Sequence, residues 1–320
     1  MAIQAQAMKG HEQMNKRLLP WVWLAISLFA LPVAAAEPLR IGILPVLDTL
    51  PLEVAVADQD FHKHGLEVAL VPFASAMERD VAMQSGNLDG YFGDLINTLM
   101  LIRNQVPMRI VTTCYRSTPG QRMFALVTAP KIELPDPSRI GPRQVGISNA
   151  TIIEYLLDKM EPAAGVPAAT LVRTEVKKIP IRLQMLLAGQ LDLAVLPEPL
   201  VSLAEQGGAR VVVTDEHLDL PLTVICLHQR VLDSHPEKAA AFIDAYRDAV
   251  TRIAADPERY RRLMAETCGI PKPLVAAYPI PRYPRPELPE PGAVAAVEQW
   301  MIGHGLLKQP FAYDRLVVPR

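Results

Sequence analysis

Short apolar runs alternate with longer segments of helical periodicity along most of the chain. The first run, Arg40–Leu44, precedes a helical pattern over Leu52–Lys63 that ends at His64 and Gly65. The same alternation predicts strands at Leu66–Phe73, Gly90–Phe92, Met108–Thr113, Gln144–Ile147, Leu171–Val176, Leu193–Leu196 and Arg210–Val213. It predicts helices at Ala76–Gln84, Leu95–Asn104, Ile152–Met160, Ile181–Leu187 and Pro199–Glu205. Strands that alternate with helices indicate parallel sheets covered on both faces.

Two stretches of this pattern resemble each other at an offset of 103 residues. The matching pairs are Arg79 and Arg182, Gly86 and Gly189, and Asp89 and Asp192. In both stretches a helix ends at a glycine, and a Leu-Asp pair and an apolar strand follow. Two independent helix–glycine–strand units would give a similar pattern, but the shared order and offset favour two equivalent lobes.

Two further strands, Phe124–Val127 and Thr223–Leu227, flank the second stretch and are predicted to cross between the lobes. The first lobe would then comprise residues 37–124 and 226–320, and the second lobe residues 125–225. Within the returning part, helices are predicted at Phe242–Ala254 and Val294–His304, and the Pro-rich segment 271–291 is predicted to be irregular.

The N-terminus has the features of a secretory signal peptide. Lys16 and Arg17 precede an apolar run, Leu18–Leu31, and the small residues Ala34–Ala36 follow. A membrane anchor is the alternative, but this run is short for a membrane span. We therefore expect residues 1–36 to be removed after Ala36 and the protein to be exported to the periplasm.

Composition narrows the possible functions. A formal net charge of −2 over 320 residues argues against a nucleic-acid partner. A disulfide between Cys114 and Cys268 is possible, although buried free thiols are favoured for these two residues and for Cys226. No nucleophile-elbow, zinc-protease, phosphate-loop or dinucleotide motif occurs, so we expect neither an enzyme nor a cofactor or metal site.

Candidate binding residues follow the predicted strands, because open parallel sheets bind ligands at the carboxyl ends of their strands. Ser75 with Glu78, and the Ser148–Thr151 segment with Glu154, form capping boxes. Helix N-termini that converge on one crevice suit a polar or anionic ligand group. Alternatively, these residues cap their own helices and do nothing else.

Three acids, Asp48, Asp94 and Glu198, also follow predicted strands. They would accept hydrogen bonds from an amine, an amidine or a ring N–H, which favours a donor-bearing ligand such as a nitrogen heterocycle. Arg116 and Arg122 are candidate cations, and an anionic ligand therefore stays open. The aromatic candidates for stacking are Tyr91, Phe92 and Tyr115, and at most one of the first two faces the crevice.

Six short motifs, each weak alone, together resemble the nitrate/sulfonate/taurine class of ABC-transporter substrate-binding proteins, which is related to thiamine-pyrimidine precursor binders. The motifs are Arg-Ile-Gly-Ile-Leu-Pro (40–45), Leu-Pro-Leu-Glu-Val-Ala (50–55), His-Gly-Leu-Glu-Val (64–68), Ser-Gly-Asn-Leu-Asp-Gly (85–90), Val-Gly-Ile-Ser (145–148) and Gly-Gln-Leu-Asp-Leu-Ala-Val-Leu-Pro-Glu-Pro (189–199). The resemblance runs from about residue 38 to the end of the chain.

This resemblance implies a type II periplasmic-binding-protein fold, with two α/β lobes joined by two crossover strands. It implies a small-molecule ligand, an ABC permease and an ATPase as partners of a monomeric protein. The ligand-binding positions it implies are Pro45, Asp48, Leu50, Ser75, Asp94, Ser148, Asn149, Thr151 and Glu198. Two alternatives stay open: an exported sensor subunit, and a pyrimidine-precursor synthase. The synthase branch relies on an active-site His and a Cys-rich motif, and this chain has no cysteine cluster.

Overall fold

The computed structural model describes residues 37–134, 136–167 and 170–319. From Pro38 onward the chain forms one structural unit. The predicted signal peptide, residues 1–36, lies outside the described residues. Among the residues that are described, no helix is both long and apolar enough to cross a membrane.

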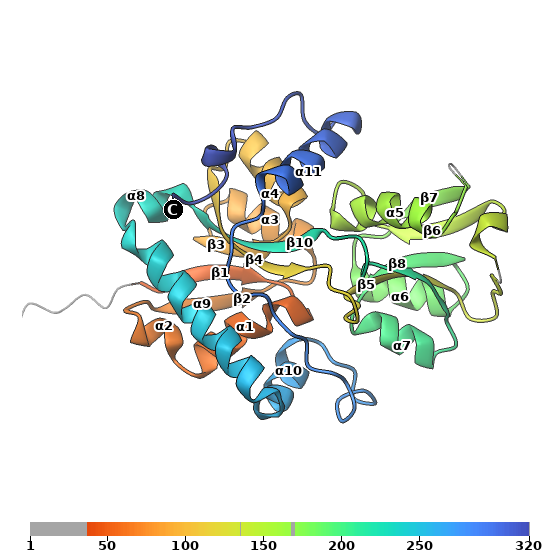
Figure 1. The fold of residues 1–320 in the computed structure, drawn as a ribbon, viewed down its shortest axis with the longest axis horizontal. Coiled ribbons are helices and arrows are strands. Elements are labelled where there is room, and N and C mark those ends of the chain that lie inside the picture. Colours follow the sequence, from red (N-terminus) through yellow and green to blue (C-terminus); the bar gives the residue numbers. More distant parts are fainter. Residues whose placement is uncertain (1–36, 135, 168–169, 320) are drawn as a thin grey trace, which may run out of the picture. The chain divides into compact units, whose positions relative to one another are not determined.

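The first sheet has the strand order β2-β1-β3-β10-β4 (Figure 1). Its strands are β1 (Leu39–Ile43), β2 (Val68–Pro72), β3 (Gly90–Gly93), β4 (Met108–Arg116) and β10 (Pro221–His228). The strand β1 is parallel to β2 and β3, whereas β10 is antiparallel to both of its neighbours. The strand β10, which returns from the second lobe, therefore lies between β3 and β4 in the first sheet.

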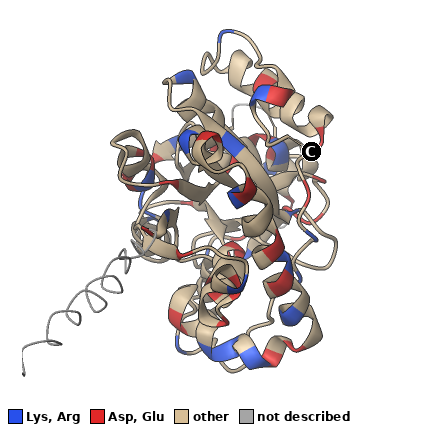
Figure 2. Cartoon of the chain, turned by 90° about the vertical axis from the view of Figure 1, so that its left-hand side faces the viewer, with Lys and Arg blue, Asp and Glu red and all other residues tan. Residues whose placement is uncertain are grey.

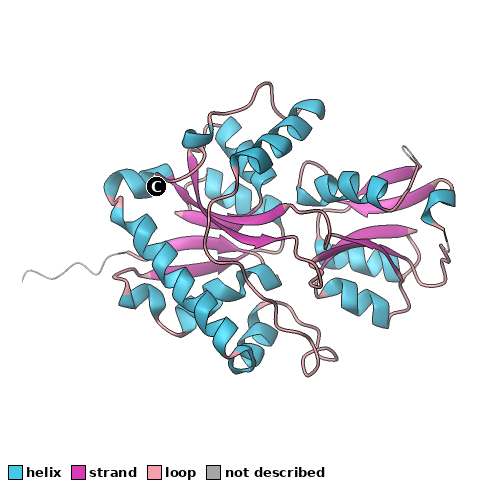
Figure 3. Ribbon diagram, in the orientation of Figure 1, coloured by secondary structure: helices cyan, strands magenta, loops and turns pink. Residues whose placement is uncertain are grey.

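Helices cover both faces of the first sheet (Figures 1 and 3). One layer contains α1 (Leu50–Ala57), α2 (Asp60–Lys63) and α9 (Glu237–Ala255), which pack on one another. The other contains α3 (Ala76–Gln84), α4 (Leu95–Arg103) and α11 (Pro291–Gly303). The shorter helices α8 (Gln229–Ser234) and α10 (Arg261–Thr267) complete this lobe.

The second sheet has the order β7-β6-β8-β5-β9. Its strands are β5 (Phe124–Thr128), β6 (Arg143–Ile147), β7 (Leu171–Glu175), β8 (Leu193–Pro197) and β9 (Val211–Thr214). Its helices are α5 (Ile152–Ala163), α6 (Ile179–Leu187) and α7 (Leu200–Gln206), and 3-10 turns lie at Leu47–Thr49, Pro137–Arg139, Pro257–Tyr260 and Tyr313–Arg315. The predicted pair of α/β lobes joined by two crossings is confirmed.

Three details differ from the sequence-based expectation. Each sheet is mixed rather than parallel, because β5 and β10 enter their sheets directly from the other lobe and run antiparallel to their neighbours. The predicted lobe boundaries at 124/125 and 225/226 fall inside β5 and β10. The helix predicted over Leu52–Lys63 is split into α1 and α2, because Gln59 has a left-handed φ of 60°. The Pro-rich segment predicted to be irregular over 271–291 contains no helix or strand up to residue 290, and its last residue, Pro291, begins α11.

The sequence repeat corresponds to a repeated structural unit. Arg79 in α3 and Arg182 in α6 are both fully buried. The Arg79 Nη1 donates to the Phe92 carbonyl over 2.6 Å, and the Arg182 Nη1 donates to the Val195 carbonyl over 2.9 Å. The two accepting carbonyls, like the two arginines, are 103 residues apart. Each arginine therefore links its helix to the central strand of the sheet in its own lobe.

A glycine makes room for each of these arginines. A Cβ atom added to Gly42 would lie 2.6 Å from the Leu88 Cδ1 and 3.0 Å from the Arg79 Cγ. A Cβ atom added to Gly146 would lie 2.5 Å from the Leu191 Cδ1 and 3.1 Å from the Arg182 Cγ. Gly42 and Gly146 are therefore required for close packing, and the same requirement in both lobes supports their equivalence.

Candidate ligand pocket

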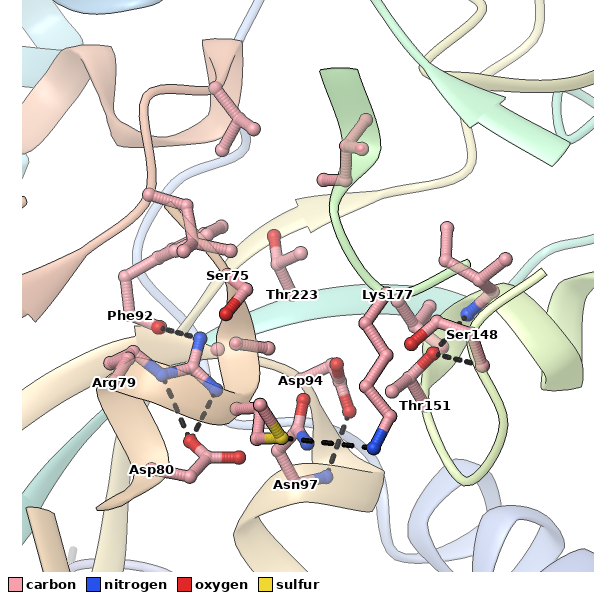
Figure 4. Close-up of a pocket in the computed structure, with 18 of the residues that line it drawn as sticks. Ser75, Arg79, Asp80, Phe92, Asp94, Asn97, Ser148, Thr151, Lys177 and Thr223 are labelled. Carbon is pink, nitrogen blue, oxygen red and sulfur yellow. Dashed lines mark hydrogen bonds and ion pairs between the residues drawn. The ribbon is translucent and has the colours of Figure 1, made fainter. Parts of the chain in front are cut away.

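A cavity of about 340 Å³ is lined by residues of both lobes. The first lobe contributes the loop after β1, the start of α3 and the β3–α4 junction. The second lobe contributes the loop between β6 and α5, the residue Lys177 and the end of β8. Figure 4 shows part of this wall, with polar groups at several strand ends. The cavity therefore lies where an open α/β sheet binds its ligand.

The structure brings seven of the nine predicted site residues into the cavity wall. These seven are Asp48, Ser75, Asp94, Ser148, Asn149, Thr151 and Glu198. Pro45 is exposed and Leu50 is fully buried in the hydrophobic core, and neither lines the cavity. The 3-10 turn at Leu47–Thr49 separates Asp48, in the wall, from Leu50, in the core. Ligand contact by all nine remains a prediction.

Asp48 is a buried acid without an ion-pair partner among the described residues. Its Oδ2 accepts a hydrogen bond from the Thr223 Oγ1 over 2.8 Å. Burial raises the pKa of Asp48 to about 7, because the charged carboxylate loses its hydration. A ligand that donates a hydrogen bond to this carboxyl group would favour its charged form.

Asp94 lies at the junction of β3 and α4 and caps the helix. Its Oδ1 accepts from the Asn97 backbone N–H over 2.9 Å. Burial raises the pKa of Asp94 to about 6, although the Asn97 N–H and the charge of Arg79 act in the opposite direction. Beside it, the Asn97 Oδ1 is buried and has no hydrogen-bond partner within the described part of the chain. This corner of the cavity therefore offers acceptors for a ligand donor.

The helix N-termini at the cavity are largely satisfied by the protein itself. The Ser75 Oγ accepts from the Glu78 N–H over 3.2 Å, as its capping box predicted. Before α5, the Glu154 Oε2 accepts from the Ala150 N–H over 2.6 Å, and the Glu175 Oε2 accepts from the Asn149 N–H over 2.9 Å. Two carboxylates thus already occupy the loop where a small anion would otherwise bind.

Glu198 is held in a network that joins the second lobe to the Pro-rich segment. Arg122 forms an ion pair with it at 2.6 Å, and the Tyr278 hydroxyl donates to its Oε2 over 2.9 Å. The Ser202 hydroxyl donates to the same oxygen over 2.9 Å. Arg122 is therefore the internal partner of Glu198. Arg116 instead pairs with Asp219 and does not line the cavity.

Several residues of the wall were not predicted as site residues. They are Arg79, Asn97, Lys177, Arg182 and Thr223, together with apolar side chains such as Val46, Met100 and Ile153. In the sequence, Arg79 and Arg182 stand out only as repeat positions. Lys177 comes two residues after β7, so the strand-end rule includes it. Of the aromatic candidates Tyr91, Phe92 and Tyr115, only Phe92 lines the cavity.

All three cysteines are free and buried, so the possible bridge between Cys114 and Cys268 is not formed. Within the described ranges, no group of three or more His, Cys, Asp or Glu side chains is arranged to hold a metal ion. Acidic and basic residues are interspersed along the ribbon in Figure 2.

The fold is that of periplasmic binding proteins. A ligand-binding component of an ABC-type import system from Staphylococcus aureus superposes with a TM-score of 0.74 at 16% identity, covering 88% of this chain and 96% of that one. The periplasmic aliphatic sulphonate-binding protein from Escherichia coli gives 0.72 at 18% identity, with 88% and 92% covered. The alkanesulfonate-binding protein from Xanthomonas axonopodis pv. citri, bound to MOPS, gives 0.71 at 18%, with 89% and 98% covered.

Sequence comparison is informative at the level of the family. No curated protein matches the chain. The NMT1-like family model matches residues 34–269, which include every predicted site residue. The chain therefore belongs to the NMT1-like family.

Proposed function

We propose that the protein is the ligand-binding component of an ABC-type uptake system and that it acts in the periplasm after loss of residues 1–36. Similar solved structures include an ABC-type import component and two sulfonate-binding proteins, which supports this role. The cavity between two lobes supports it as well, because lobe closure on a ligand gives a permease a bound state to recognise. The protein binds its ligand without converting it.

The ligand class is inferred from two buried acids, Asp48 and Asp94, in a cavity with many apolar wall residues. An apolar body would fill the space between them, and donor groups would satisfy their carboxylates and the Asn97 Oδ1. The loop before α5 is already bonded to Glu154 and Glu175, so a bare anion such as nitrate is poorly served. We therefore assign a small molecule with an apolar body and N–H donors.

Thermal unfolding of the mature protein in the presence of a compound panel tests both the binding role and the assigned ligand class. The panel contains sulfonates, nitrate, bicarbonate, aminopyrimidines and aromatic carboxylates. Donor-bearing compounds should raise the unfolding temperature, and each should be recovered unchanged after long incubation. Stabilisation by simple anions alone would refute the assigned ligand class, and turnover of a bound compound would refute the binding role.

The variant Asp94→Asn tests the site directly. Asparagine is also a good N-cap, so the start of α4 should survive while the negative charge is removed. We expect the affinity for a donor-bearing ligand to fall by on the order of tenfold or more, with an unchanged circular dichroism spectrum. An unchanged affinity would remove Asp94 from the site.

A further inference from the structure

The repeated arginine units differ in one respect that bears on the cavity. In the first lobe, the Asp80 Oδ1 accepts from the Arg79 Nε over 3.0 Å and from its Nη2 over 2.6 Å. The residue 103 positions after Asp80 is Leu183, which is buried and apolar. The counter-ion of the first arginine is therefore missing from the second unit.

Arg182 is bonded to backbone carbonyls instead. Its Nε and Nη2 donate to the Val176 oxygen over 3.1 and 2.8 Å, and its Nη1 donates to the Val195 oxygen. No carboxylate of the described residues lies within ion-pair distance of it. Burial lowers the pKa of Arg182 to about 10 despite the charge of Glu175. A buried cation without a counter-ion is costly, and this one lines the cavity.

Lys177 adds a second cation to the same side of the cavity. Its ammonium group lies 3.7 Å from the Met77 sulfur in the first lobe, and its nearest carboxylate oxygen, in Glu175, is 3.8 Å away. Figure 4 shows its side chain extending from the second lobe toward the corner of Asp94 and Asn97. The wall from the second lobe thus has two weakly compensated positive charges.

The wall from the first lobe has the opposite character. Asp48 and Asp94 are buried acids without ion pairs among the described residues, and the Asn97 Oδ1 lacks a donor. Each lobe therefore presents charge that its own residues compensate only weakly, and the sign differs between the lobes.

We infer that the ligand is bipolar, with a protonated amine or amidine for Asp48 and Asp94 and an acid group for Lys177 and Arg182, separated by an apolar spacer. This inference rests on the proposed binding function and specifies the ligand of the same cavity. Each lobe binds one end of such a molecule, so both ends are satisfied only when the lobes are closed. A bipolar ligand therefore binds the closed state in preference to the open one, which is the condition for driving closure.

Two matched compound sets test the inference by isothermal titration calorimetry at a pH of about 8, where the acids are ionised. One set is ε-aminocaproate, hexylamine and hexanoate, and the other is para-aminomethylbenzoate, benzylamine and benzoate. In at least one set, the bipolar compound should bind on the order of tenfold more tightly than either relative with a single charged group.

Equal binding by the amine alone would overturn the inference and leave the binding role intact. Failure of all six compounds, in a protein stabilised by another member of the panel, would also overturn it. A protein that binds no compound of either experiment would count against the proposed function itself.

Substitutions at Leu183 and Lys177 test the acid end of the ligand. Leu183→Asp supplies the missing counter-ion and should weaken binding of the bipolar compound by on the order of tenfold relative to Leu183→Asn.

The substitution Lys177→Gln lies at a half-exposed position and tests the same point if the Leu183 variants fail to fold. It should weaken the bipolar compound but not the amine, whereas Lys272→Gln, at an exposed position outside the cavity wall, should change neither. Equal affinities in Lys177→Gln and Lys272→Gln would refute the role of Lys177.

Discussion

The substitution Asp48→Asn should stabilise the protein at neutral pH and abolish part of its pH dependence. The pKa of Asp48 rises from its ordinary 3.8 to about 7 on folding, because the carboxylate is buried. Between these two values the folded protein holds a proton that the unfolded chain releases. The free energy of unfolding is therefore highest below pH 3.8, falls as the pH rises, and levels off above about pH 7. Above pH 7 the protein is therefore less stable than at low pH by roughly 4 kcal/mol.

Asparagine carries no charge, so the variant does not lose this stability as the pH rises. We expect the two proteins to be equally stable near pH 4 and the variant to be more stable by up to about 4 kcal/mol near pH 8. Urea unfolding followed by circular dichroism at several pH values measures the difference. Asp94, whose pKa is also raised by burial, acts in both proteins and cancels in the comparison. A stability difference that does not change with pH would refute the reasoning.

Three further predictions concern packing and the contacts between lobes. Gly146→Ala should lower the stability by about 1–3 kcal/mol, because the new methyl group would overlap Leu191, and thermal unfolding measures this. Trp300→Phe removes the 2.6 Å hydrogen bond from the indole of α11 to Asp158 of α5. Because this bond joins the two lobes, ligand affinity measured by calorimetry should fall, and an unchanged affinity would mean that the bond also exists in the open state. Glu198→Gln should cost about 2 kcal/mol in chemical unfolding, because it weakens a charged hydrogen-bond network, and an unchanged midpoint would contradict that network.

Much of the fold could be predicted from the sequence because local signals agree with the final packing. The helix α3 has its predicted bounds because Ser75 caps its start, and Gly86, just beyond its end, has a φ of 73°. The split between α1 and α2 was not predictable, because Gln59 adopts a left-handed conformation that its side chain does not favour. The short helices α8 and α10 were missed, because each spans two turns or fewer and lacks clear periodicity.

The site was predicted in outline by the strand-end rule, which placed Asp48 and Asp94 in one cavity. Leu50 was included through the resemblance to the family, which does not distinguish a wall residue from a core residue, and Leu50 is buried in the core. The hydrogen bond from Tyr278 to Glu198 was also not predicted, because Tyr278 lies 80 residues further along the chain. Lys177 was not among the predicted site residues although it follows β7, and the packing of the two lobes brings it to the cavity.

The position of β10 inside the first sheet has a consequence for the order of folding. Its residue Ile225 pairs with Phe92 of β3, 133 positions earlier in the chain. The second sheet, in contrast, is built from one continuous stretch, from Phe124 in β5 to Thr214 in β9. Contacts between distant residues form slowly, because the intervening chain must first be ordered. The second lobe should therefore assemble first and act as the folded insert around which the first lobe closes, so that the late β10–β3 pairing sets the rate at which a complete binding cavity appears.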